Sequence, residues 1–210
     1  MKKNTLKERF EKSLKGAKSG IISDQTYVGY CYSVGCGVGK DYRKANYWFG
    51  RAAKKGDIHA IFNLALTYDL GTGVSRNALK AMRLYKEAAM RGDMEAQNNL
   101  ATLLMDGDGV KQNVKEGLYW IRKAARKGDS KAQYNLGRYY VDGEFTKKNY
   151  RYAQIWLSKA AAKGHSRAQR LLKSITNKSE SITNSVKSTK ICRRNTRMGT
   201  YDANLNRIGK

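Results

Sequence analysis

The side chains that most often act in catalysis or metal binding are few and scattered. The sequence has two histidines, His59 and His165, and three cysteines, Cys31, Cys36 and Cys192. No CxxC or HxxxH spacing joins them, so they form no recognisable zinc-binding pattern. A catalytic centre needs titratable groups that converge on one place, and this spacing brings none together. We therefore expect surface histidines, a packed Cys31, no catalytic residue, no metal and no cofactor.

Glycine pairs are the other feature that suggests ligand chemistry. The segments Gly71-Thr72-Gly73-Val74 and Gly107-Asp108-Gly109-Val110 superficially look like phosphate-binding loops. A phosphate loop needs a strand–GxxxxGK–helix context, which is absent here. The pairs also recur at a fixed interval, which is typical of turns between repeated elements. The sequence therefore indicates no enzyme, and the elements that carry the glycines become more informative than the glycines themselves.

Many residue types recur every 36 positions. Four glycines, each closing an Ala-Ala-x-x-Gly segment, are Gly56, Gly92, Gly128 and Gly164. One large apolar position is held by Trp48, Leu84, Trp120 and Trp156. Chance does not align so many positions over four periods. The pattern predicts an all-α solenoid of helix–turn–helix repeats, in which each unit buries its apolar face only against its neighbours.

One unit shows how the two helices are expected to form. Ala132, Leu136 and Tyr140 recur every four residues, which places them on one face of a helix over about 130–141. A second helix is expected over about 149–163, followed by a glycine that adopts a left-handed cap. Residues that can cap the second helix are Asp41, Asn77, Asn113 and Asn149, and those that can cap the first are Asp57, Asp93 and Asp129.

The repeat divides the chain into three parts. Residues 1–20 are expected to contain a lone capping helix, over about 7–19. Residues 21–174 are expected to form the array, with four units (21–56, 57–92, 93–128 and 129–164) and a final capping helix. Residues 175–210 carry eight Lys/Arg against two Asp/Glu and none of the repeated positions. We expect this basic tail to be disordered, or ordered only on binding.

The repeated positions resemble the Sel-1-like repeat, a relative of the tetratricopeptide repeat. The resemblance rests on Ala132-Gln133-Tyr134-Asn135-Leu136-Gly137-Arg138-Tyr139-Tyr140, on Asp106-Gly107-Asp108-Gly109-Val110, and on the segment from Trp120 to Asp129. It covers about 21–172 and implies a right-handed superhelix with a scaffold or adaptor role, of the bacterial type. Two departures are the fourth loop, Gly143-Glu144-Phe145-Thr146, and Asp24, which stands where alanine is expected.

Charge supports an alternative function. Lys and Arg number 42 against 17 Asp and Glu, a net charge of +25 that favours anionic partners such as nucleic acid. The competing interpretation is that these cations simply lie on solvated helix faces along the whole chain. The sequence contains no apolar run of 18 residues, so we expect no membrane span. The charged N-terminal residues do not resemble a signal peptide. Together with an odd number of unpatterned cysteines, these features favour a cytoplasmic location.

The favoured function is a non-enzymatic scaffold that binds a partner protein or peptide on the concave side of the superhelix. The first helix of each unit buries its Ala, Leu and Tyr positions, so we expect its opposite stripe to face outward. Four-then-three spacing selects Phe62, Leu66, Asp69, Asn98, Thr102, Met105, Tyr134, Arg138 and Val141. These residues are the predicted partner-binding site, and the nucleic-acid alternative stays open.

Overall fold

The computed structural model describes residues 2–177, and every regular element in this part of the chain is a helix. The helices are α1 (Lys2–Lys18), α2 (Ile22–Val34), α3 (Tyr42–Lys54), α4 (Ile58–Leu70), α5 (Ala78–Met90), α6 (Met94–Asp106), α7 (Val114–Lys127), α8 (Ser130–Asp142) and α9 (Tyr150–Ala162), followed by an unlabelled helix over 166–177. Residues 178–210, most of the expected basic tail, lie outside the described residues.

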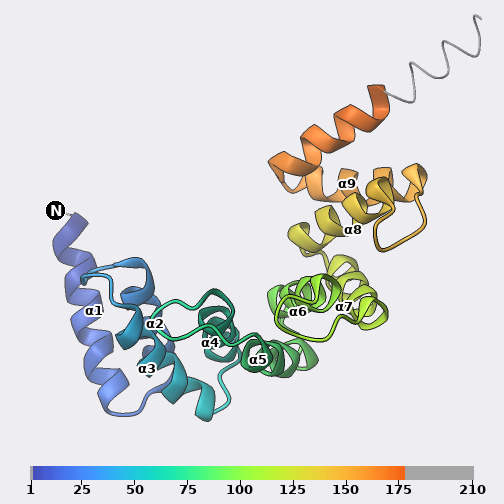
Figure 1. The fold of residues 1–210 in the computed structure, drawn as a ribbon. Coiled ribbons are helices and arrows are strands. Elements are labelled where there is room, and N and C mark those ends of the chain that lie inside the picture. Colours follow the sequence, from blue (N-terminus) through green and yellow to red (C-terminus); the bar gives the residue numbers. More distant parts are fainter. Residues whose placement is uncertain (1, 178–210) are drawn as a thin grey trace, which may run out of the picture.

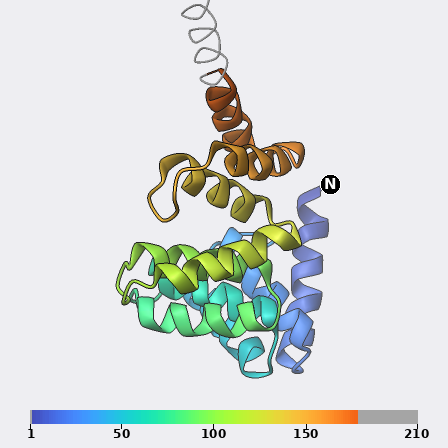
Figure 2. The ribbon, with the colours of Figure 1, turned by 90° about the vertical axis from the view of Figure 1, so that its right-hand side faces the viewer.

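The helices form a curved row, with α1 at one end and the 166–177 helix at the other (Figures 1 and 2). The extensive contacts among α1–α9 are all between helices that follow each other in the chain. We call α2, α4, α6, α8 and the 166–177 helix the A helices, and α1, α3, α5, α7 and α9 the B helices. The predicted all-helical solenoid is confirmed.

Capping side chains determine where the helices begin. An aspartate precedes each of three A helices, and its Oδ1 accepts the backbone N–H of the residue three positions later at 2.6–2.7 Å. These aspartates are Asp57, Asp93 and Asp129. Before four B helices the same bond forms at 2.9–3.1 Å on Asp41, Asn77, Asn113 and Asn149. These bonds satisfy backbone donors that the helix leaves unpaired. The predicted caps are therefore confirmed.

Small residues allow the helices to approach closely. The alanines that precede the repeated glycines, Ala52, Ala88, Ala124 and Ala160, are completely buried. Trp48 and Trp120 are buried beside them, while Trp156 is half-buried. The glycines after the B helices, Gly56, Gly92, Gly128 and Gly164, have φ values of 81–101°. This left-handed region is accessible to glycine without a steric penalty, as the sequence predicts.

A column of cations ties each unit to the one before it. The Lys55 ammonium donates to the Gly20 carbonyl at 2.7 Å, and the Arg91 guanidinium donates to the Gly56 carbonyl at 2.6 Å. Lys127 and Lys163 make the same bond to the carbonyls of Gly92 and Gly128. Part of the positive charge of the chain therefore has a structural role, because these cations satisfy carbonyls at the ends of B helices.

The fourth loop departs from the other loops as its sequence indicates. In the third loop Gly109 packs so closely on α5 that an added β-carbon would lie 2.7 Å from the Ala78 Cβ. Phe145 takes the equivalent place in the fourth loop, and its ring instead packs edge-on against Tyr139 at 5.1 Å.

Within residues 2–177, no helix is both long enough and apolar enough to cross a membrane.

Candidate functional site

Within residues 2–177, a pair of hollows lies on the surface formed by the A helices, each between neighbouring A helices. We call this surface the A-helix face. The first hollow, of about 420 Å³, lies between α4 and α6 and is lined by Leu66, Asp69, Leu70, Asn98, Asn99, Thr102, Leu103, Asp106 and Asp108. We call it the acidic hollow. The second, of about 440 Å³, lies between α8 and the 166–177 helix and is lined by Tyr134, Arg138, Asp142, Arg167, Arg170 and Leu171. We call it the basic hollow.

The carboxylates of the acidic hollow differ in their partners. The buried Tyr85 hydroxyl donates to Asp69 Oδ2 at 3.2 Å and accepts from the Asn99 amide at 3.3 Å. Burial raises the pKa of Tyr85, so it remains a neutral donor. Asp108 pairs with Arg76 at 2.6 Å. Asp106 is exposed and makes no ion pair within residues 2–177. The hollow therefore holds more negative than positive charge.

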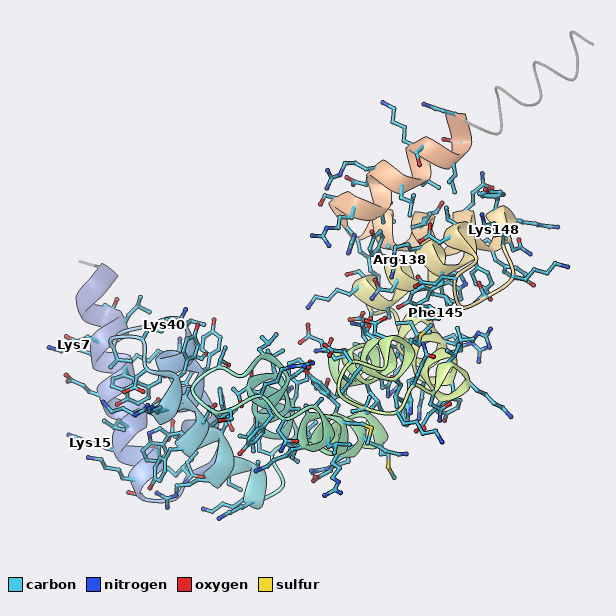
Figure 3. All side chains as sticks on the ribbon, viewed as in Figure 1. Lys7, Lys15, Lys40, Arg138, Phe145 and Lys148 are labelled. Carbon is cyan, nitrogen blue, oxygen red and sulfur yellow. The ribbon has the colours of Figure 1, made fainter. Side chains whose placement is uncertain are left out.

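The basic hollow has the opposite character. Arg138 on α8 (Figure 3) lies 3.4 Å from Asp142 and 3.8 Å from Glu144, and all three side chains are partly exposed. Arg167 and Arg170 are exposed and form no ion pair in the described part of the chain. Because an arginine guanidinium matches a carboxylate in a two-bond geometry, this hollow is suited to acidic side chains.

Aromatic stacking positions the other wall of the basic hollow. The Tyr134 ring stacks on His165, with centroids 4.7 Å apart and planes at 20°. His165 is itself fixed, because its Nδ1 accepts the backbone N–H of Ala168 and so caps the last helix. The sequence predicts a surface histidine here, whereas His165 is half-buried and caps a helix. Tyr134 lines the basic hollow together with Arg138, Arg167 and Arg170.

A chain of amides connects α6 to α8. The Asn135 amide donates to Asn98 Oδ1 at 3.0 Å, and the Asn98 amide donates to Asn99 Oδ1 at 3.2 Å. Asn98 is only 6% exposed, so the predicted outward position is wrong for this residue. Polar groups therefore continue from the acidic hollow toward α8.

The hollows contain six of the nine residues that the sequence selects. Leu66, Asp69, Asn98 and Thr102 line the acidic hollow, and Tyr134 and Arg138 line the basic hollow. Phe62 packs against the core, with its ring 6.0 Å from that of Tyr85. Val141 packs against the last core cluster. Neither residue lines these two hollows.

Met105 does not face solvent, so this part of the prediction is wrong. Its side chain is 0% exposed and turns toward α7. The cause is Gly117, which stands where α3, α5 and α9 have Ala45, Ala81 and Ala153. The missing methyl group leaves the room that Met105 fills. That break in the alanine column was visible in the sequence and could have indicated a buried Met105.

The groups able to perform covalent or metal chemistry are dispersed. His59 is exposed on α4, and the two cysteines in the described part of the chain, Cys31 and Cys36, are free. Burial raises the pKa of the Cys31 thiol, which reduces the reactive thiolate. Residues 2–177 contain no group of three or more His, Cys, Asp or Glu side chains arranged to hold a metal ion. What the A-helix face offers is ion pairing, hydrogen bonding and apolar contact.

The sequence did not single out one further surface, on the outside of α7. A hollow of about 620 Å³ is lined by Lys115, Tyr119, Arg122, Lys123, Arg126 and Lys127, and we call it the α7 stripe. Tyr119 is 56% exposed, and Lys123 lies 4.8 Å from the Trp120 ring. The signal that could have found it is the recurrence every three or four residues of Lys115, Tyr119, Arg122 and Arg126.

The chain is similar in sequence and in fold to solved structures of other proteins. A protective antigen present in uropathogenic Escherichia coli strains, with an SLR fold, is 36% identical with a TM-score of 0.70, over 76% of this chain and 34% of that one. A Sel1 repeat protein from Oxalobacter formigenes is 37% identical with a TM-score of 0.65, over 72% and 60%. The match thus spans about a third and about three-fifths of these two chains.

A more distant likeness shows the fold alone. An immunity protein from Pseudomonas aeruginosa is 21% identical with a TM-score of 0.54, over 76% of this chain and 59% of that one. No curated protein matches the chain significantly. The Sel1 repeat matches four consecutive segments, 23–57, 58–93, 95–129 and 130–165. These segments coincide with the helix pairs described above, and the chain belongs to the Sel1 repeat family.

Proposed function

We propose that the chain is a non-enzymatic scaffold that binds a partner protein or peptide on its A-helix face, the side expected to be concave. Sel1 repeat proteins are generally scaffolds for protein–protein interactions. The observation that carries the proposal for this chain is the pair of hollows between successive A helices, which gather six of the nine selected residues. A cytoplasmic location belongs to the same proposal and is supported by the odd, unpatterned set of three cysteines.

The composition of this face supports a protein partner. Interface energy concentrates in aromatic and arginine residues that are partly enclosed, and Tyr134 with Arg138 forms such a pair. Leu66 and Leu70 add apolar area beside polar amides in the acidic hollow. Uncompensated carboxylates repel phosphates, so the acidic hollow disfavours nucleic acid on this face.

The nucleic-acid alternative depends on the α7 stripe. Five of its six side chains are basic and one is an exposed tyrosine. Phosphate contacts by such a stripe would be mostly electrostatic and strongly salt-dependent. The two functions therefore place the contact on different helices, and substitutions can separate them.

A matched pair of variants tests the proposal. The variant Tyr134→Ala/Arg138→Glu alters the basic hollow, and Tyr119→Ala/Arg122→Glu makes the same chemical change on the α7 stripe. Both should keep the helical circular dichroism of the wild type. Each protein is used to capture partners from native lysate, with and without nuclease, and the captured proteins are identified by mass spectrometry.

We expect a protein that binds the wild type and the α7 variant, resists nuclease, and is lost with the basic-hollow variant. Capture that survives in a folded basic-hollow variant would refute binding on the A-helix face. Capture that disappears on nuclease treatment and with the α7 variant would establish the nucleic-acid alternative instead.

A further inference from the structure

The positive charge of the chain is unevenly distributed, and its distribution follows the two hollows. Residues 57–108, which include the acidic hollow, carry five Lys/Arg against seven Asp/Glu, a net charge of −2. Residues 109–177, which include the basic hollow, carry 16 against four, a net charge of +12. The positive charge is therefore absent from residues 57–108 and lies in the segments on either side of them.

The acidic hollow is arranged to hold a cationic side chain. Tyr85 fixes Asp69 through its Oδ2, and no hydrogen bond within residues 2–177 reaches Oδ1. Asp106 lines the same hollow without an ion pair in that part of the chain. Arg76 forms an ion pair with the Asp108 carboxylate and also donates to the Asp69 backbone carbonyl at 2.9 Å, so it lies at the edge of the hollow. Two carboxylates thus remain for a ligand.

The basic hollow is arranged to hold an anionic side chain. Arg167 and Arg170 lie on successive turns of the last helix and line the hollow without ion pairs in the described residues. Arg138 faces them from α8, shared with Asp142 at a distance of 3.4 Å. A carboxylate between these arginines would gain charge-assisted hydrogen bonds.

The spacing of the hollows suits an extended segment. The acidic hollow lies between α4 and α6 and the basic hollow between α8 and the last helix, two steps along the row of A helices. Packed helices lie about 8–10 Å apart. Neighbouring A helices are not in extensive contact and so lie at least that far apart, which separates the hollows by at least about 20 Å. An extended chain covers about 3.3–3.6 Å per residue, which corresponds to at least about six residues.

We propose that the partner presents an extended segment of opposite polarity, with Lys or Arg in the acidic hollow and Asp or Glu at least about six residues away in the basic hollow. This inference rests on the proposed function and specifies the chemistry of the partner. Opposite charges at the two ends of the face determine which way the segment runs, because the reversed segment places like charges together. Between the two ends lies Asn135 on α8, whose amide donates to Asn98 at the acidic hollow.

Synthetic peptides test this inference directly. Two fluorescein-labelled peptides of about twelve residues carry a block of lysines and a block of glutamates at opposite ends, separated by about six serine and alanine residues, in the two possible orders. Three controls are a lysine-only peptide, a glutamate-only peptide, and a peptide of the same composition in which lysine and glutamate alternate. Binding is measured by fluorescence anisotropy at low salt and at about 0.3 M NaCl.

We expect one of the two block orders to bind at least about tenfold more tightly than the alternating peptide and both uniform peptides, because the two contacts reinforce each other. High salt should weaken this binding. If the lysine-only peptide binds as tightly as the favoured block peptide, the partner does not need charges of both signs. The A-helix face would then remain the binding surface, but the proposed segment of opposite polarity would be refuted. No saturable binding of any peptide up to about 1 mM would overturn recognition by charge on this face.

Variants of matched charge locate the contact. Asp69→Asn/Asp106→Lys alters the acidic hollow, and Arg167→Glu/Arg170→Gln alters the basic hollow by an equal and opposite charge. Each should weaken the favoured peptide about tenfold. The control Lys115→Glu/Arg126→Gln makes the same change as the basic-hollow variant but on the α7 stripe, and it should leave binding unchanged.

Combining the two hollow variants keeps the net charge of the protein and exchanges the polarity of the face. The combined variant should prefer the opposite block order. The affinity for the favoured peptide could instead stay unchanged in both hollow variants and disappear in the α7 control. That result would refute binding on the A-helix face itself, and with it the proposed function. All variants are first compared with the wild type by circular dichroism, and any that is not folded is replaced by Asp106→Asn or Arg167→Gln, for which weakening of about threefold is expected.

Discussion

Gly117 tests whether the close packing of α6 on α7 explains the burial of Met105. In the variant Gly117→Ala the added β-carbon would overlap the Met105 side chain and lie 3.0 Å from the Ala101 carbonyl oxygen. Overpacking of this kind costs about 1–3 kcal/mol. Alanine is the better helix former by about 1 kcal/mol, which offsets part of the loss. We expect a net decrease of about 0–2 kcal/mol in the free energy of unfolding.

Gly50 provides the matched control, because it also lies inside a B helix. A β-carbon added there meets nothing within 4 Å. Gly50→Ala should therefore stabilise the protein by about 0.4–1 kcal/mol. Urea denaturation followed by far-ultraviolet circular dichroism measures both variants. Although both glycines lie inside B helices, Gly117→Ala should be less stable than Gly50→Ala.

A double variant makes the test specific to the contact. The fourth unit has Val141 and Ala153 at the places of Met105 and Gly117. Introducing this pair as Met105→Val/Gly117→Ala should destabilise the protein by about 1–2 kcal/mol less than the sum of the two single changes. Additivity within about 0.5 kcal/mol would refute the reasoning, since it would mean that the two side chains do not compete for one space.

Three further results are expected. Trp120→Ala should lower the free energy of unfolding by about 3–5 kcal/mol and Ala124→Leu by about 1–3 kcal/mol, measured by urea denaturation; melting like the wild type would contradict their placement in the core. The hydrogen bond that Lys86 donates lowers the pKa of Glu116, so its stabilisation is present at neutral pH and is lost as the pH falls through that lowered pKa. Glu116→Gln should thus destabilise the protein at pH 7 but not in acid, in denaturation curves recorded across pH, and a constant difference would contradict this. A chain ending at Asn177 should melt at the temperature of the full chain, since no repeated position lies beyond it; a large decrease would show that the remaining residues dock on the array.

Most of the fold could be predicted because the relevant signals are local and repeated. Asp57 and its equivalents cap helices through bonds to residues three positions away, and Gly56 and its equivalents end helices through their own backbone angles. Such features depend on a few neighbouring residues. A period of 36 residues then fixes which helices are neighbours.

The site was less predictable because it depends on contacts between units. The sequence pattern treats equivalent positions alike, but Asp69 is half-exposed where its equivalent Met105 is buried, since Gly117 replaces alanine on the facing helix. Asp24 shows the same exchange: it is larger than the alanine expected there, and it faces Gly16, where a β-carbon would overlap its carboxylate. Comparing facing columns, rather than one column at a time, would have found both.

The charge also required the structure for its interpretation. The sequence left two interpretations open, anionic partners and solvated helix faces along the whole chain. Instead, Lys55, Arg91, Lys127 and Lys163 bind carbonyls of the preceding unit, while the middle of the array is slightly acidic. A net charge alone therefore says little about the partner, because the face with the hollows carries both signs.

The most direct test of the account is photo-crosslinking in the living cell. A photoreactive phenylalanine analogue is placed at Leu66, in the acidic hollow, and in a second protein at Tyr119, on the α7 stripe. The account predicts that Leu66 becomes linked to a partner protein on irradiation and that Tyr119 does not. A protein linked only at Tyr119, or nucleic acid linked at either position with no protein at Leu66, would contradict the claim that the A-helix face is the binding surface.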